Sequence, residues 1–245
     1  MKIVSWNIAG VPDWANMFGH PTTRVNNILR TLEKIDPDII CLQEVFSNNV
    51  RWSLWGTLFQ KYDVRMSRQS GILCNGGLLI ASKWPIIDYN YYIFKDGCGE
   101  DWLAEKGFMN IIVQKGNKKV SIVNTHLNAD SILSSKVRSK KKRQKQVYDI
   151  LAYISQIEVF DYNILCGDLN DGFNSNVVDS IRKTIRKYHF HYYNEAPINT
   201  FENRQLDYIF LWGNKILRNI QTVKMEEPIL SDHSLLLTNI NRVQG

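Results

Sequence analysis

Acidic, amide and imidazole side chains stand at the ends of apolar runs in this sequence. The run ILCG, at residues 164–167, is followed at once by Asp168, Asn170 and Asp171. Comparable polar residues end or follow other apolar runs: Asn7, Glu44, His126, Asn128, Asp207, Asp232 and His233. A buried strand needs no such side chains, whereas loops held by a rigid sheet are where sites are built. The pattern therefore predicts one site assembled from several strand ends.

The residue types in this set favour a hard divalent cation. Singly, each has an ordinary explanation: Asn7 can cap a turn, Glu44 can pair with Arg24 or Arg30, and His126 can be a hydrogen-bonded core residue. Together they match Mg²⁺, which takes carboxylate and amide oxygens and keeps water and substrate phosphate as its other ligands. The sequence has no Cys/His cluster typical of zinc. We therefore expect Mg²⁺, with Mn²⁺ as an alternative.

The elements that must position these residues are short strands and a few helices. Eight runs are rich in Ile, Val and aromatic residues, as strands are: KIVSW, DIICLQ, GLLIAS, FMNIIVQ, KVSIVNTHL, YNILCGD, LDYIFLW and SLLLTNI. Apolar residues at three- and four-residue steps predict helices over 23–35, 137–157 and 174–187. Many strands with few, separated helices predict an α+β or layered α/β/β/α arrangement.

Length and composition suit a globular chain. With 245 residues, 44% of them hydrophobic, and no Pro/Gly/Ser-rich linker, we expect a single domain over residues 1–245 that acts as a monomer. The sequence shows no apolar run of about 18 residues and no signal-peptide pattern. We therefore expect an intracellular protein that is soluble or peripherally bound to membranes. Four cysteines without CxxC spacing are expected to be reduced thiols.

The net charge of +6 comes from one segment. Residues 136–145, KVRSKKKRQK, contain seven Lys or Arg and no acid, and the rest of the chain is close to neutral. This basic segment has two interpretations. It is either the solvated face of a helix start, or a patch that attracts nucleic acid or an anionic membrane surface.

Six motifs, in order, resemble the signature of the endonuclease/exonuclease/phosphatase superfamily: WNIAG, LQEVF, NTHLNAD, CGDLND, LDYIF and SDHS. They span residues 3–237. Each motif is weak alone, but the ordered set is specific. The resemblance implies a DNase I-like, four-layer α/β/β/α sandwich, in which two mainly antiparallel sheets pack face to face with helices outside.

Two further segments resemble the neutral sphingomyelinases within that superfamily: NGGLLIASKWPI at 75–86 and FKDGCGEDWLAEKGFMNI at 94–111. The helix RQKQVYDILAYI also matches. His126, within NTHL, argues against the abasic-site endonucleases, which carry a Tyr motif at this point. The chain differs from the secreted bacterial enzymes in having no export signal and a short stretch between Leu211 and Leu230, where they carry an exposed aromatic hairpin.

The motif residues and the resemblance together imply roles at the site. Glu44 and Asn7 would hold Mg²⁺, with Asp232 as a further ligand. His233 would be the general base, with a pKa near neutrality, and Asp207 would orient its ring.

The remaining residues would act on water and substrate. Asp168 would align the attacking water, while Asn170 and His126 would donate hydrogen bonds to the phosphate oxygens. Asp101 and Lys106 match an Asp and a Lys that neutral sphingomyelinases carry beside the site. They are expected either to gate or contact substrate, or to form an exposed salt bridge.

Three functions are compared. The favoured one is a Mg²⁺-dependent phosphodiesterase that hydrolyses sphingomyelin to ceramide and phosphocholine, by in-line attack of water, at a membrane surface. The second is a Mg²⁺-dependent endonuclease or other phosphoesterase of the same fold, which the basic segment favours. The third is a catalytically silent module that binds phosphate or lipid. Such a module would be expected to lack a site residue, and this sequence retains the full set.

Overall fold

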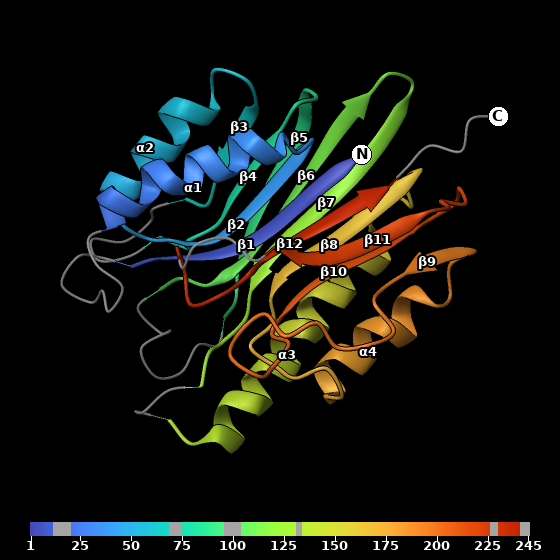
Figure 1. Ribbon diagram of the computed structural model, residues 1–245. Helices are drawn as coiled ribbons and strands as arrows, with labels where there is room; N and C mark the ends of the chain where they lie inside the picture. Colours follow the sequence, from blue (N-terminus) through green and yellow to red (C-terminus); the bar gives the residue numbers. More distant parts are fainter. Residues whose placement is uncertain (12–20, 69–74, 96–103, 131–133, 226–229, 241–245) are drawn as a thin grey trace.

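The computed structural model describes residues 1–11, 21–68, 75–95, 104–130, 134–225 and 230–240, and Figure 1 shows their arrangement. One sheet contains β1 (Lys2–Gly10), β2 (Ile39–Val45), β3 (Asp63–Met66), β4 (Leu79–Ser82), β11 (Ile220–Met225) and β12 (Leu235–Ile240). The other contains β5 (Ile86–Ile93), β6 (Gly107–Lys115), β7 (Lys118–His126), β8 (Tyr162–Asp168), β9 (Phe190–Tyr192) and β10 (Asp207–Gly213).

Each six-stranded sheet is built around one parallel pair of strands. The first sheet has the order β11-β12-β1-β2-β4-β3 and the second β5-β6-β7-β8-β10-β9. The pairs β1–β2 and β7–β8 are parallel, and the other pairings recorded for these strands are antiparallel. The carboxyl ends of two parallel neighbours lie side by side at the same end of the sheet. In each sheet, the residues that follow the parallel pair are therefore close together.

Four helices in the described residues cover the outer faces: α1 (Pro21–Ile35), α2 (Asn48–Leu58), α3 (Lys136–Gln156) and α4 (Asn176–Ile185). The first two pack on the first sheet, and α3 and α4 pack on the second (Figure 1). Serine caps start the last two, because Ser135 accepts from the backbone N–H of Arg138 and Ser175 from that of Val178. The predicted four-layer α/β/β/α sandwich is confirmed.

Alternate residues of the central strands enter different cores. Ile3 and Ile39 lie between the two sheets, whereas Val4 and Ile40 pack under α1 and α2. A third core joins the second sheet to α3 and α4. Because both faces of these strands are covered, they appear in the sequence as continuous apolar runs rather than as alternating patterns. That is why eight strands were identifiable from composition.

The elements that the sequence did not predict have mixed or unusual patterns. β3, β5, β9 and β11 are short or partly exposed, so their apolar periodicity is weak. α2 has apolar residues on its outer face as well as its inner face, which removes the helical periodicity. No helix of the described ranges is long and apolar enough to cross a membrane. Cys41 and Cys166 are buried free thiols, as expected, and Cys74 and Cys98 lie outside the described residues.

Charged residues gather where β1 and β2 begin. Lys83 Nζ lies 2.9 Å from a carboxylate oxygen of Asp36 and 3.7 Å from one of Asp38, and Lys61 also pairs with Asp36. These side chains are partly exposed. The hydrogen bonds from Lys61 and then Lys83 lower the pKa of Asp36 to about 2. This end of the sandwich is therefore an exposed network of lysine–aspartate pairs.

Candidate active site at the ends of the parallel strands

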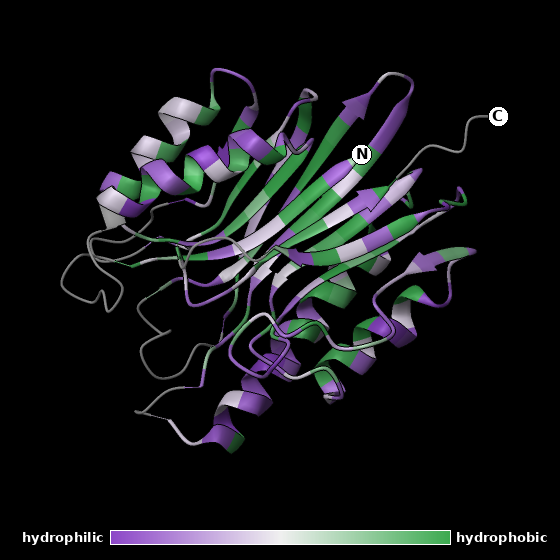
Figure 2. Cartoon of the chain, viewed as in Figure 1, coloured by the Kyte–Doolittle hydropathy of each residue, from purple (hydrophilic) through white to green (hydrophobic). Residues whose placement is uncertain are grey.

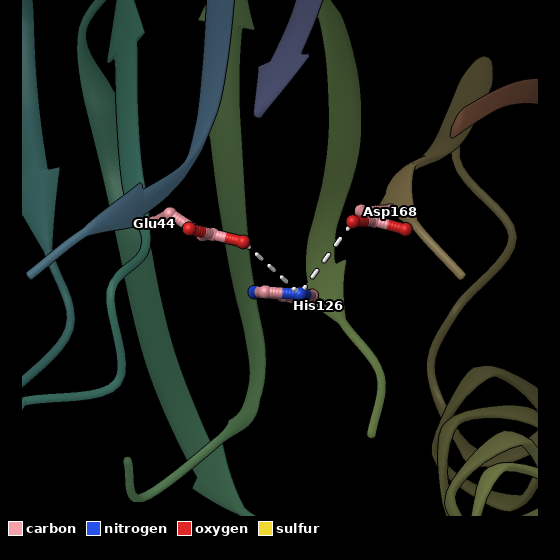
Figure 3. Close-up of side chains that lie close together, drawn as sticks. All are labelled: Glu44, His126 and Asp168. Carbon is pink, nitrogen blue, oxygen red and sulfur yellow. Dashed lines mark ion pairs between the residues drawn. The ribbon is translucent and has the colours of Figure 1, made fainter. Parts of the chain in front are cut away.

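The predicted site residues converge at the opposite end, where the parallel strands finish. His126 and Asp168 are paired in register as the last residues of β7 and β8, and Asp207, the first residue of β10, is paired with Asp168. Asn7 and Glu44 come from the end regions of β1 and β2 in the facing sheet. Figure 3 shows the imidazole of His126 between the carboxylates of Glu44 and Asp168. The site is thus shared by both sheets.

Asn7 links the carboxylates of the two sheets. Its side-chain amide donates to Glu44 Oε1 at 2.8 Å and to Asp168 Oδ2 at 3.0 Å, and its Oδ1 accepts from the backbone N–H of Ala9. Glu44 has a φ of 57°, a left-handed conformation that is uncommon for a residue with a Cβ and concentrates at functional sites. Burial raises the pKa of Glu44, against the effects of Asn7 and Lys106.

Lys106 and His126 form a second contact within the site. Lys106 is buried, and its Nζ lies 3.0 Å from His126 Nε2 and donates to the carbonyl of Leu127 at 3.0 Å. Burial, and then the charge of Lys106, lower the pKa of His126 well below its usual value. The ring is therefore neutral, so its Nε2 can accept from Lys106. Lys106 is buried, which contradicts the exposed position that one of its two interpretations required. Asp101 lies outside the described residues, so its role with Lys106 stays a prediction.

His233 stands between two acids. Its Nδ1 lies 2.7 Å from Asp207 Oδ2, and its Nε2 lies 3.7 Å from Asp168 Oδ2. Burial lowers the pKa of His233, but the carboxylates of Asp207 and Asp168 outweigh it and raise that pKa to about 10. The sequence predicted a value near neutrality, the ordinary pKa of a histidine, whereas the nearby carboxylates of Asp207 and Asp168 raise it. For Asp168, an acid, burial has the opposite effect and raises the pKa to about 7.

The donor set fits a hard divalent cation. Two groups offer ligand atoms within 4.8 Å of one another: Glu44, His126 and Asp168, and then Asp168, Asp207 and His233. The raised pKa values of Glu44 and Asp168 mean that their negative charge is poorly compensated. Within the described residues, Asp207 Oδ1 is buried without a hydrogen-bond partner. A bound cation would supply the missing positive charge.

Residues 4–233 match the protein family described as the Endonuclease/Exonuclease/phosphatase family. The chain belongs to this family. The match extends from β1 to His233 and so contains every residue of the strand-end site described above.

Two curated relatives that this chain resembles are named sphingomyelinases. Sphingomyelinase C 2 of Leptospira interrogans is 28% identical over 95% of this chain and 38% of its own length. Sphingomyelinase C of Bacillus cereus is 32% identical over 54% of this chain and 45% of its own length. The chain therefore matches less than half the length of these curated relatives.

A solved structure shares the fold over nearly the whole chain. Staphylococcus aureus beta toxin, as an F277A, P278A mutant with bound magnesium ions, superposes with a TM-score of 0.81 at 20% identity. The match covers 97% of this chain and 98% of the other. At this identity the likeness establishes the fold, and it agrees with the two-sheet sandwich.

The other predicted residues lie at the same end of this family's sandwich. Asn170 has a φ of 49°; its backbone N–H donates to Asp168 Oδ1 and its side chain to the carbonyl of Leu127. Asp232 is exposed, at the rim, and accepts from Ser231 Oγ. The ligand roles of Asn7 and Asp232 stay predictions, since Asn7 presents its N–H groups to the carboxylates.

Some supporting residues of the site were not predicted. Arg24 is buried and donates to the carbonyls of Ile8, Ala9 and Leu230, so it fastens the end of β1 to the segment before His233. It carries these contacts instead of the ion pair with Glu44 that the sequence allowed. The available signal in the sequence was the position of Arg24, four residues before Ile28 and in step with the apolar face of the helix, because an arginine on that face is rarely buried without a partner.

Arg143, on α3, contacts the two loops that follow β7 and β8. Arg143 is buried, donates to the carbonyl of Asn128, and pairs with Asp130 at 2.8 Å and Asp171 at 3.2 Å. Asp171 also accepts from the N–H of Gly172, as expected of a turn residue. One arginine of the basic segment is thus structural.

Gly167 explains part of the CGDLND motif. A Cβ there would lie 1.9 Å from the carbonyl oxygen of Thr125, and its φ of 137° is in the region that favours glycine. Glycine therefore lets β8 approach β7 closely, one residue before Asp168 and His126 pair.

Proposed function

We propose that this chain is a Mg²⁺-dependent phosphodiesterase that hydrolyses sphingomyelin to ceramide and phosphocholine. The observation that carries the proposal is the convergence of three acids and two histidines, from both sheets, on one buried site. The printed names of the relatives, sphingomyelinase C and sphingomyelinase C 2, support the choice of substrate. The magnesium ions in the beta toxin structure support the choice of metal, with Mn²⁺ as an alternative.

Glu44 would hold the cation, with Asp168 beside it and Asn7 and Asp232 as further candidates. Bound there, Mg²⁺ neutralises negative charge that develops on the phosphate oxygens as water attacks. Asn7 keeps Glu44 and Asp168 together through its two hydrogen bonds. Arg24 keeps the end of β1 in place beneath them.

His233 is the general base and Asp207 orients its ring through the 2.7 Å contact to Nδ1. With that nitrogen engaged, Nε2 is the atom that takes the proton from water, and Asp168 lies 3.7 Å away to align that water. At a pKa of about 10 the ring is protonated at neutral pH. Neutralising charge on the nearby acids lowers this pKa and frees the base.

Lys106, His126 and Asn170 face the phosphate. Lys106 brings a positive charge to the centre of the site, where it contacts the neutral ring of His126. Asn170 is fixed by its contacts to Asp168 and Leu127. Donors fixed before substrate arrives stabilise developing negative charge without reorganisation.

A substrate panel tests this function. Purified protein is assayed with sphingomyelin, lysophosphatidylcholine, phosphatidylinositol and plasmid DNA, each with Mg²⁺, with Mn²⁺ and with EDTA. We expect release of phosphocholine from sphingomyelin that requires the metal. Cleavage of DNA alone would contradict the proposal. Size-exclusion chromatography in the same buffer tests the proposed monomer, and limited proteolysis tests the single domain.

The basic segment supports a second candidate, a nuclease of the same fold. Lys140 and Lys141 are exposed and Lys142 is partly exposed at the start of α3, whose Arg143 holds the loops that follow the site strands. Replacing these three lysines with Ser, and leaving Arg143 intact, removes charge without loosening those loops. A nuclease would lose DNA cleavage in this variant, and it would show negligible lipid hydrolysis.

A further inference from the structure

Helix α2 carries large apolar side chains on both of its faces. The inner set is buried in the core beneath the helix and consists of Val50, Leu54 and Leu58. The outer set is exposed: Trp52 by 59%, Trp55 by 36% and Phe59 by 58%. A surface helix usually presents a polar outer face, and a helix that is apolar all round is usually covered on both sides. The outer face of α2 is therefore suited to contact something beyond this chain.

The three outer rings form a continuous stripe. Trp52, Trp55 and Phe59 are three and four residues apart, so they lie on one side of the helix. The rings of Trp52 and Trp55 meet edge to face with centroids 6.1 Å apart, and those of Trp55 and Phe59 stack at 4.9 Å. We call these three residues the aromatic stripe. Contiguous exposed apolar surface of this kind marks docking sites for proteins, ligands or membranes.

The helix segment that carries the aromatic stripe has almost no charge of its own. From Ser47 to Gln60 the sequence contains one ionisable residue, Arg51, and its side chain is buried and donates to the carbonyl of Ser67. The other outward residues are Asn, Ser, Gly, Thr and Gln. Figure 2 shows the contrast, with α2 mostly white and green and the first turns of α3 purple. Anionic lipid attracts basic residues, so a helix face without them gains no binding affinity from anionic lipid.

Aromatic rings among uncharged polar groups match the headgroup level of a zwitterionic membrane. Trp is enriched at membrane–water interfaces because its ring is apolar and its N–H is polar. A phosphocholine interface has both charges but no net charge, which suits a stripe whose own segment, residues 47–60, exposes no charged side chain.

The helix also begins beside the candidate active site. Asn48, its first residue, follows Glu44 by four positions, and the backbone N–H groups of Phe46 and Ser47 donate to the carbonyl of Gly10 at the end of β1. Helix α2 therefore starts at the end of the sandwich where the strand-end site lies and runs toward the opposite end, where Lys61 pairs with Asp36. A membrane that touches the whole stripe lies along the side of the sandwich, and Trp52 is the ring of the stripe nearest in sequence to Glu44.

We propose that the aromatic stripe docks the protein onto the interface of a phosphocholine-rich membrane. The proposal rests on the proposed function, because a lipid substrate is what brings this surface to a bilayer. Docking by the stripe is independent of the basic segment on α3. The stripe acts through burial of aromatic area, which salt does not screen, whereas binding through lysines weakens as salt rises.

The test measures co-flotation with phosphatidylcholine vesicles. It uses the Glu44→Gln protein, so that no lipid is consumed, and compares it with the same protein carrying Trp52→Ser, Trp55→Ser and Phe59→Ser. We expect the triple change to weaken partitioning at least roughly tenfold, because three aromatic rings no longer leave water. Salt up to about 1 M should not weaken binding of the parent protein. A second variant, Trp52→Phe with Trp55→Phe, should retain most of the binding.

A matched control removes equally exposed apolar side chains elsewhere. Ile87, Tyr148 and Ile216 are exposed by 52%, 55% and 60%, and they lie on β5, on α3 and after β10. Their combined replacement by Ser should leave vesicle binding unchanged. Loss of binding in this control as great as in the stripe variant would show general hydrophobic adhesion and overturn the proposal.

Two other outcomes overturn it. One is that the parent protein does not float with phosphatidylcholine vesicles, or that the stripe variant floats as well as the parent. The other is a dimer in sedimentation equilibrium that the stripe variant abolishes while vesicles bind neither protein; the stripe is then a self-association surface.

The failure of docking and the failure of the proposed function give different results. Hydrolysis of sphingomyelin in detergent micelles without vesicle binding would reject only docking. Stripe-dependent vesicle binding by a protein that hydrolyses no sphingomyelin would reject only the catalytic proposal.

Discussion

The two ends of the sandwich use the same residue types under opposite conditions. Where β1 and β2 begin, Asp36 is exposed, contacts Lys61 and Lys83, and has a pKa lowered to about 2. Where β7 and β8 end, Asp168 is buried and burial raises its pKa to about 7. The two acids lie at opposite ends of the same sandwich, Asp36 before β2 and Asp168 at the end of β8. Solvent and lysine contacts separate a structural aspartate from one placed for chemistry.

This difference shows what each end lacks. At the exposed end, Asp36 and Asp38 each have a lysine partner. At the buried end, Glu44, Asp168 and Asp207 gather around His233 and Lys106, and burial raises the pKa of Glu44 and of Asp168. Buried carboxylates without enough positive charge nearby destabilise the fold, so we expect the protein to be less stable when no cation is bound. A carboxylate change at the two ends should therefore have unequal effects, which the following measurements test.

The largest effect is expected for Glu44→Gln. Removing this carboxylate takes away the principal candidate ligand, so activity on sphingomyelin should fall by at least about 100-fold, and excess Mg²⁺ should restore it only in part. Asp38→Asn, at the exposed end, is the matched control and should keep full activity. Metal titrations of both variants make the comparison. Normal turnover of Glu44→Gln at low Mg²⁺ would remove Glu44 from the site.

A comparable loss is expected at the base. His233→Ala should lower kcat by about 100-fold or more, the low end for loss of a general base. Asp207→Asn removes the carboxylate that most raises the pKa of His233. A base acts when unprotonated, so a lower pKa moves the rising limb of the kcat–pH profile to lower pH. A limb in the same place as in the parent would show that another group titrates.

A smaller effect concerns stability without metal. The pKa of Asp168 rises from its unfolded value near 3.8 to about 7 on folding. For an acid with a raised pKa, stability is full below the unfolded pKa and falls as pH rises through the folded pKa. Asn cannot ionise, so the Tm of Asp168→Asn relative to the parent should increase from pH 4 to pH 8 in EDTA. A difference that is constant with pH would contradict the assignment.

The smallest effect is expected for Asp36→Asn. The lowered pKa of Asp36 means that its ion pairs stabilise the fold above the unfolded pKa, and that this stabilisation is lost as pH falls through about 2. The variant should therefore have a slightly lower Tm than the parent at pH 7, and this difference should shrink toward zero as pH falls through about 2. High salt should reduce the difference at pH 7, because exposed charges are screened. An effect as large as that of Asp168→Asn would break the comparison between the two ends.

The strand ends could be predicted from sequence because covered strands leave uninterrupted apolar runs, and polar residues after them stand out. For this reason the sequence predicts that Asp168, His126 and Glu44 belong to one site. The pKa of His233 could not be predicted, because the contact with Asp168 depends on how the sheets face each other. The structural role of Arg143 was hidden within the basic segment. α2 was missed because its aromatic stripe replaces the polar face by which a surface helix is recognised.

The site joins parts of the chain that are far apart in sequence. The side chain of Asn7 contacts that of Asp168 across 161 positions, and the indole of Trp6 donates to the carbonyl of His233 across 227. Contacts of this separation form late in folding, since the loops they close are long. Enzyme activity should therefore return only in the last kinetic phase of refolding, after each sheet has regained its own hydrogen bonds. The rate at which turnover recovers would then report the rate at which one sheet packs on the other.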